Sequence, residues 1–66
     1  MKVNVIRSRM ALKGITQGNL AKLLGISRNT MSSRMTGHSS FTLEEVRRLC
    51  EILEISDDEK RQIFLP

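Results

Sequence analysis

The chain has 66 residues, of which 39% are hydrophobic and 27% charged, and its formal net charge is +4. So short a chain has apolar surface for one small core, so we predict a single domain over residues 1–66. The single cysteine excludes a disulfide framework and a cysteine-rich zinc site, and no apolar run approaches the roughly 20 residues that span a bilayer. We therefore expect a cytoplasmic protein, neither secreted nor membrane-spanning.

Charge is unevenly distributed along the chain. Residues 1–40 contain seven Lys and Arg residues and no acidic residue, whereas residues 41–66 contain all seven acidic residues and four basic ones. A basic half favours a polyanion as partner, with the acidic half facing away from it. On charge alone, an ordinary solvated surface explains the pattern equally well.

Helix signals follow one another along the chain, whereas strand signals are nearly absent. The fold class is therefore predicted to be all-α, with five short helices. They lie at about residues 3–13, 17–24 and 28–35, from Thr42 to about Leu53, and from the cap Ser56 through Ile63, Phe64 and Leu65. Gly14, Gly25 and Gly37 stand where the first three helices end.

Polar residues mark the helix starts, and apolar residues mark their inner faces. Thr16 and Ser27 are predicted N-caps, and two pairs have the spacing of a capping box: Thr42 with Glu45, and Ser56 with Glu59. The first two helices are expected to face the core with Ile6 and Met10, and with Leu20, Leu23 and Leu24.

The stretch from Gln17 to Thr36 has the pattern of two helices that meet at a steep angle. The small residue Ala21 stands where the helices cross, and Gly25 tolerates a positive φ at the bend between them. Apolar residues are spaced to fill the wedge between the two helices: Leu20, Leu24, Ile26 and Met31.

With these positions the chain resembles the helix-turn-helix family of lambdoid phage repressors and Cro proteins, also called the XRE family. The matching residues are Gly14-Ile15-Thr16-Gln17, Leu20-Ala21, Leu24-Gly25-Ile26-Ser27, Thr30-Met31-Ser32 and Gly37. The resemblance covers about residues 3–60. It implies a lambda-repressor-like domain whose helix-turn-helix, at about residues 17–36, binds double-stranded DNA.

The resemblance also implies that the third helix enters the major groove with its N-terminal residues at base edges. Helical spacing places four polar residues on its outer face, and these are the predicted base contacts: Arg28, Asn29, Ser32 and Ser33. Arginine bonds two acceptors of guanine, and asparagine pairs bidentately with adenine. A phosphate contact is the alternative for Arg28, and the two serines can act only by being small enough to admit the DNA.

Phosphate contacts are expected on either side of this helix. The family's Gln at the first turn of the second helix contacts a phosphate, which implies that role for Gln17; a simple helix-start residue is the alternative. The loop after the third helix is expected to offer N–H groups and hydroxyls to neighbouring phosphates, as the family's loop does. The predicted phosphate contacts are Gln17, Ser27, Arg34, Gly37, His38, Ser39 and Ser40, with Lys22, Arg7 and Arg9 as weaker candidates.

Two features depart from the family's pattern. Met10 and Met35 stand where the family commonly has an Arg and a Glu that form a partly buried ion pair. Replacing both partners can be neutral or stabilising, whereas replacing one strands a buried charge, so the joint change supports the alignment. Arg34 stands where the family usually has an apolar residue, which puts local packing in question and adds a basic group on the DNA side.

No residue pattern indicates catalysis, and we expect no enzymatic activity, metal or other cofactor. His38 is the only histidine and has no second ligand at a metal-binding spacing. Cys50 lies among apolar residues and is expected in the core rather than as a nucleophile. The acidic residues follow helix capping and solvent-face patterns.

These observations predict a sequence-specific DNA-binding transcriptional regulator, a small repressor or Cro-like protein of phage or mobile-element type. It would occupy an operator as a homodimer, without a small-molecule substrate. The tail Ile63-Phe64-Leu65 can supply the dimer contact or can merely close the monomer core. The alternative function is an antitoxin or anti-repressor whose helices bind another protein.

Overall fold

The structure, a computed structural model, describes residues 3–64. These residues form five α-helices and no strand, which confirms the predicted all-α class. The helices are α1 (Val3–Lys13), α2 (Gln17–Leu24), α3 (Arg28–Thr36), α4 (Leu43–Ile52) and α5 (Asp57–Phe64). The prediction differs by one residue at the ends of α3 and α4.

The helix ends follow the sequence signals. Thr16 and Ser27 accept hydrogen bonds from the backbone N–H groups of Asn19 and Thr30, at 3.1 and 3.0 Å. Both predicted capping boxes form, at the starts of α4 and α5. Gly25 ends α2 with a φ of +74°, a backbone conformation that residues with a Cβ rarely adopt.

The helices share one buried core, to which each of them or its adjoining loop contributes. Its members are Ile6, Met10, Leu20, Ala21, Leu24, Met31, Met35, Leu49, Cys50, Leu53, Ile55 and Ile63. Met10 and Met35 both belong to it, so the expectation that this pair of methionines is apolar core is confirmed. Cys50 is buried as predicted, and burial raises the pKa of its thiol.

Leu23 departs from the predicted inner face of α2. Leu23 is 47% exposed, whereas Leu20, Ala21 and Leu24 form the buried stripe of the helix. Around the helix axis, Leu20, Leu24 and Ala21 follow one another on one side, and Leu23 comes next to Leu20 on the outer edge of that stripe. The backbone carbonyl of Leu23 instead accepts a hydrogen bond from Arg48 on α4, at 3.0 Å.

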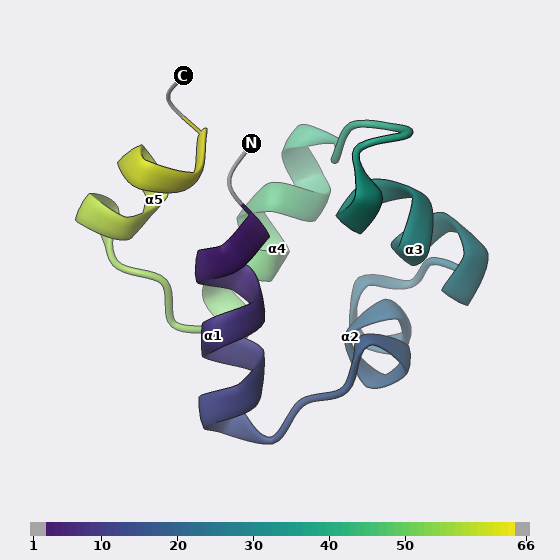
Figure 1. Cartoon of the computed structure of the whole chain (residues 1–66), viewed down its shortest axis with the longest axis horizontal. Helices are drawn as coiled ribbons and strands as arrows, with labels where there is room; N and C mark the ends of the chain where they lie inside the picture. Colours follow the sequence, from purple (N-terminus) through teal and green to yellow (C-terminus); the bar gives the residue numbers. More distant parts are fainter. Residues whose placement is uncertain (1–2, 65–66) are drawn as a thin grey trace.

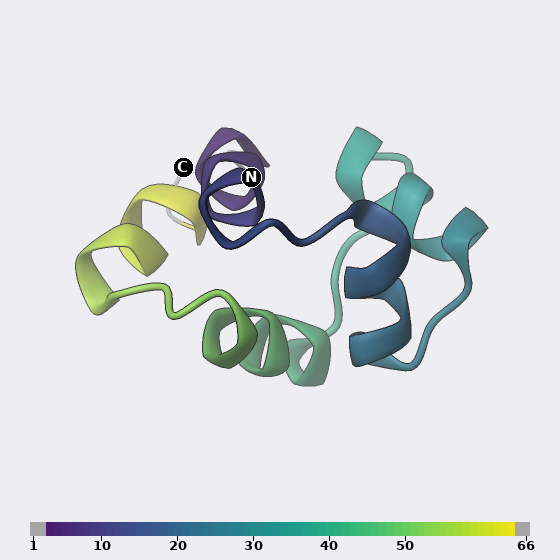
Figure 2. The ribbon, with the colours of Figure 1, turned by 90° about the horizontal axis from the view of Figure 1, so that it is seen from below.

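The arrangement of the helices places α2 and α3 at one end of the molecule. Figure 1 and Figure 2 show these two helices beside each other, with α5 at the opposite end and α1 and α4 between them. α2 packs against both α3 and α4, and α1 packs against α5. The pair α2–α3 therefore has one side on the core and another side open to solvent.

Candidate nucleic-acid interface

The outer face of α3 begins with exposed polar side chains. Arg28, Asn29 and Ser32 are exposed, whereas Met31 and Met35 point into the core. The three exposed residues carry a guanidinium, an amide and a hydroxyl, which are groups that can bond base edges or phosphates. Three of the four predicted base contacts therefore lie on an open surface.

The fourth, Ser33, lies differently. It is half-buried, and its Oγ is 2.8 Å from the Oγ of Ser39 in the following loop. This hydroxyl links α3 to the loop, which gives it a local partner that the spacing of the sequence does not reveal. The open polar face is thus narrower than predicted and centres on the N-terminal half of α3.

The start of α2 lies next to the start of α3. Thr16, Gln17, Gly18 and Arg28 line one pocket of about 350 Å³. Gln17 is half-buried at the first position of α2, and it shares this pocket with the exposed Arg28. The structure therefore brings together the predicted phosphate contact of α2 and the leading base contact of α3.

Ser27 is the N-cap of α3, and its hydroxyl has two local partners. The Oγ accepts a hydrogen bond from the N–H of Thr30 and donates one to the Oγ1 of Thr30, at 2.9 Å. A phosphate contact through this hydroxyl would compete with the cap.

The loop after α3 was expected to offer backbone N–H groups, and three of them are already in use. The N–H of Gly37 donates to the carbonyl of Arg34, and the N–H groups of His38 and Ser39 both donate to the carbonyl of Ser33. These bonds satisfy the carbonyls of Ser33 and Arg34 in the last turn of α3. The loop therefore has mainly side chains to offer to a phosphate.

Among those side chains, His38 and Ser40 are exposed. The Nδ1 of His38 is 2.8 Å from the Oγ1 of Thr36, which fixes the ring against the end of α3. Within residues 3–64, Ser40 forms no hydrogen bond. Of the four predicted loop contacts, these two side chains are the ones best placed for a ligand.

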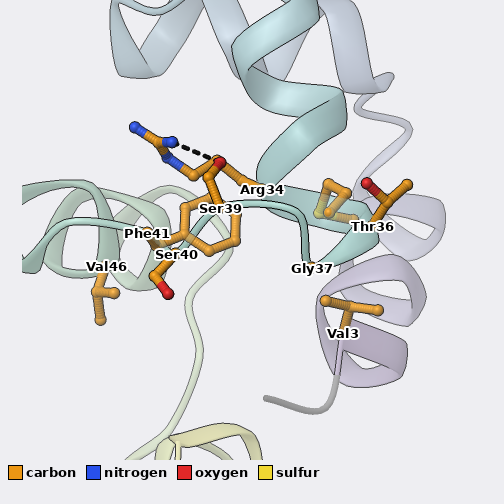
Figure 3. Close-up of a pocket in the computed structure, with 9 residues that line it drawn as sticks. Val3, Arg34, Thr36, Gly37, Ser39, Ser40, Phe41 and Val46 are labelled. Atoms are coloured by element: carbon orange, nitrogen blue, oxygen red, sulfur yellow. Dashed lines mark hydrogen bonds between the residues drawn. The ribbon is translucent and has the colours of Figure 1, made fainter.

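Arg34 forms an ion pair that was not predicted. Its Nε donates to the Oε1 of Glu45 at 2.9 Å. Its Nη1 donates to the Oγ of Ser39 at 2.7 Å, the bond that Figure 3 marks with a dashed line. The Arg34 and Glu45 side chains are only 18% and 12% exposed. The hydrogen bond between them lowers the pKa of Glu45 and raises that of Arg34. Arg34 thus holds the loop to α4, and Glu45 compensates its charge.

The same loop borders a second pocket, of about 440 Å³, at the start of α1. Figure 3 shows Val3 and Thr36 on one side of it and Arg34, Ser39 and Phe41 on the other. Phe41 and Val46 pack against the core from this side. Among the described residues, the one charged residue that lines this pocket is Arg34, and it is paired with Glu45.

Two further basic residues of the N-terminal half have acidic partners. Arg9 pairs with Glu59 on α5 at 3.2 Å and donates a hydrogen bond to the carbonyl of Glu54, and Lys13 pairs with the Glu54 carboxylate. The guanidinium of Arg9 is therefore bonded to the acidic half of the chain. Within the described part of the chain, the basic residues of residues 1–40 without an ion pair are Arg7, Lys22 and Arg28.

Residues 3–64 contain no cluster of three or more His, Cys, Asp or Glu side chains that could hold a metal ion. None of the five described helices has the length and apolar character that crossing a membrane requires.

The family model described as a helix-turn-helix domain matches residues 4–63, nearly the whole chain. No curated protein and no solved structure is similar enough to the chain to match it. The matched range includes α2 and α3, whose geometry agrees with the resemblance drawn from the sequence.

Proposed function

The chain belongs to the helix-turn-helix domain family, and we propose that it is a sequence-specific DNA-binding regulator of the repressor or Cro type. In this class the second helix of the motif lies in the major groove while the first crosses the backbone. Here those helices are α3 and α2. The protein would act by occupying an operator and so changing access to a promoter.

One observation carries the proposal: the starts of α2 and α3 form a single polar surface. Gln17 and Arg28 line the same pocket, and Asn29 and Ser32 continue along the exposed side of α3. A phosphate contact at Gln17 would set the position of α3 on the duplex, and Arg28 and Asn29 would then meet base edges. His38 and Ser40 would contact the backbone from the loop beyond α3.

We further propose that two copies bind two half-sites as a homodimer. Dimers of this class read half-sites about 34–36 Å apart, one turn of DNA. Ile63 is completely buried in the monomer, which favours the core-closing role for that part of the tail. Leu65, the last apolar residue of the tail, lies outside the described residues.

Selection of bound sequences from a random duplex pool tests the proposal. We expect the wild-type protein to select a defined site with two related half-sites. The double variant Arg28→Ala, Asn29→Ala should fold and lose the selected preference, because it removes both bidentate base readers. Arg61→Ala with Gln62→Ala is a matched control, since it removes a guanidinium and an amide that are exposed on α5.

The control pair should leave selection unchanged. If Arg28→Ala, Asn29→Ala selects the wild-type site with wild-type affinity, α3 is not the recognition helix. If the wild-type protein selects no sequence but captures a partner protein, the antitoxin or anti-repressor function replaces this one. Light scattering of the protein–DNA complex checks the dimer, and a single copy on a single half-site would contradict it.

A further inference from the structure

Gly18 is the second residue of α2, and its backbone does not need glycine. The glycines with positive φ among the described residues are Gly14, Gly25 and Gly37, so Gly18 has a conformation that any residue can adopt. Glycine inside a helix is less favourable than alanine. Its presence here therefore calls for a reason other than backbone conformation.

The reason lies in the space beside the α-carbon. A Cβ placed on Gly18 would lie 3.1 Å from the Nε and from the Nη2 of Arg28, and 3.2 Å from its Cζ. These distances are shorter than ordinary van der Waals contacts between a Cβ and its neighbours. One whole side of the guanidinium therefore rests against the start of α2, at a place where any side chain would crowd it.

The end of Arg28 has no polar partner in the described part of the chain, which leaves its packing against α2 to restrain it. Within residues 3–64, the guanidinium forms no ion pair and no hydrogen bond, and the residue as a whole is exposed. A long arginine side chain in water samples many rotamers, and each rotamer lost on binding weakens the complex. A surface that holds the guanidinium in one place before binding reduces that loss.

We propose that Gly18 is a positioning residue for Arg28, an inference that rests on the proposed DNA-binding function. By lacking a side chain, Gly18 lets the guanidinium lie against α2 beside Gln17. The position of the guanidinium relative to the first turn of α3 then determines which group of the DNA it meets. Gly18 acts through Arg28 and does not itself read a base.

A graded pair of substitutions tests the inference. Gly18→Ala should displace the guanidinium by a few tenths of an ångström, and Gly18→Leu should displace it fully. Both residues are better helix formers than glycine, so the thermal unfolding midpoint should not fall. The preference for the selected base pair nearest Arg28 should weaken slightly with alanine and about tenfold with leucine, within the range of one bidentate contact.

A double-mutant cycle with Arg28→Ala separates positioning from direct interference with DNA. If Gly18 acts through Arg28, Gly18→Leu should change the affinity and preference of the Arg28→Ala protein by less than twofold. An equal loss in both backgrounds would mean that the leucine collides with DNA, and would overturn the inference. So would a Gly18→Leu protein that keeps the wild-type preference while Arg28→Ala loses it.

A measurement without DNA keeps this test independent of the proposed function. The Nε–H resonance of Arg28 should show restricted motion by nuclear relaxation in the wild-type protein and greater mobility in Gly18→Leu. Equal mobility in the two proteins would overturn the inference. If Gly18 restricts the motion of Arg28 but the wild-type protein selects no DNA sequence, the DNA-binding function fails and the role of Gly18 in recognition fails with it.

Discussion

Glu45 shows how one side chain serves two structural purposes. Its Oε1 accepts a hydrogen bond from the N–H of Thr42, which closes the capping box of α4, and another from the Nε of Arg34. Only the first of these is local in sequence. The capping spacing therefore predicts the residue's place but not its burial or its partner on α3.

The partnership changes the interpretation of Arg34. Met10 and Met35 remove a buried ion pair that the resemblance implies for the family, and this chain has a different one between α3 and α4. Arg34 also donates a hydrogen bond to Ser39, so it fixes the loop that follows α3. A charged residue is accommodated at position 34 because Glu45 pairs with it.

Glu45→Ala should lower the free energy of unfolding by about 1.5–3 kcal/mol, measured by urea denaturation. The substitution removes charge-assisted hydrogen bonds and leaves Arg34 partly buried without its carboxylate. Glu44→Ala is the matched control, because Glu44 pairs with Arg47 on the exposed side of the same turn. Exposed pairs of this kind contribute little. Equal effects of the two substitutions would contradict a structural role for the Arg34–Glu45 pair.

At the scale of helices, the sequence predicts most of the fold because helix ends have local causes. A hydroxyl before the first turn or a glycine after the last acts within a few residues, so its effect can be read from neighbouring positions. Leu23 is more exposed and Ser33 more buried than helical spacing predicts, because a helix face has a border and the border depends on which other segments pack there. Part of the candidate site is predictable for the same local reason, because helical spacing alone places Arg28 and Asn29 on the exposed face of α3.

The contact between Gly18 and Arg28 could not be predicted in that way. The two residues are on different helices, and their distance depends on the angle between α2 and α3. The sequence offers one indication of it, a glycine near the start of a helix where the backbone does not require glycine. The bonds of the Gly37–Ser39 N–H groups to α3 were foreseeable in principle, since a glycine that ends a helix usually returns such bonds.

Gly25→Ala should destabilise the protein by about 1–2 kcal/mol, the cost of placing a residue with a Cβ in the left-handed region. Nothing lies within 4 Å of a Cβ built at Gly25, so the loss would come from backbone conformation and not from a collision. Gly25→Asn should cost less, because asparagine adopts this conformation more readily. Thermal unfolding of both variants checks the order, and an alanine variant as stable as the asparagine one would contradict it.

At the scale of the whole molecule, the two oppositely charged halves are joined. Three basic side chains of residues 1–40 pair with carboxylates of residues 41–66: Arg9 with Glu59, Lys13 with Glu54, and Arg34 with Glu45. The acidic half therefore neutralises part of the basic half while holding α1 and α3 in place. The basic charge left without an ion pair among the described residues is smaller than the count suggests, and it includes Arg28 at the start of α3.

These pairs predict a stability that falls in acid. The hydrogen bond from Lys13 lowers the pKa of Glu54, and that from the backbone of Ser56 does most to lower the pKa of Glu59, with Arg9 adding to it. In the unfolded chain both carboxyls return to about 4.5. A carboxyl with a lowered pKa when folded contributes stability above its unfolded pKa and loses it as the pH falls through the folded value.

Urea unfolding from neutral pH to about pH 3 measures this dependence. Glu54→Gln with Glu59→Gln should be less stable than wild type at neutral pH, and the difference should shrink as the pH falls below 4.5, because wild type then loses the same charges. Added salt should also reduce the neutral-pH difference, since both carboxylates are accessible to solvent. A difference that persists unchanged in acid would mean that these glutamates stabilise the fold by packing and not by their charge.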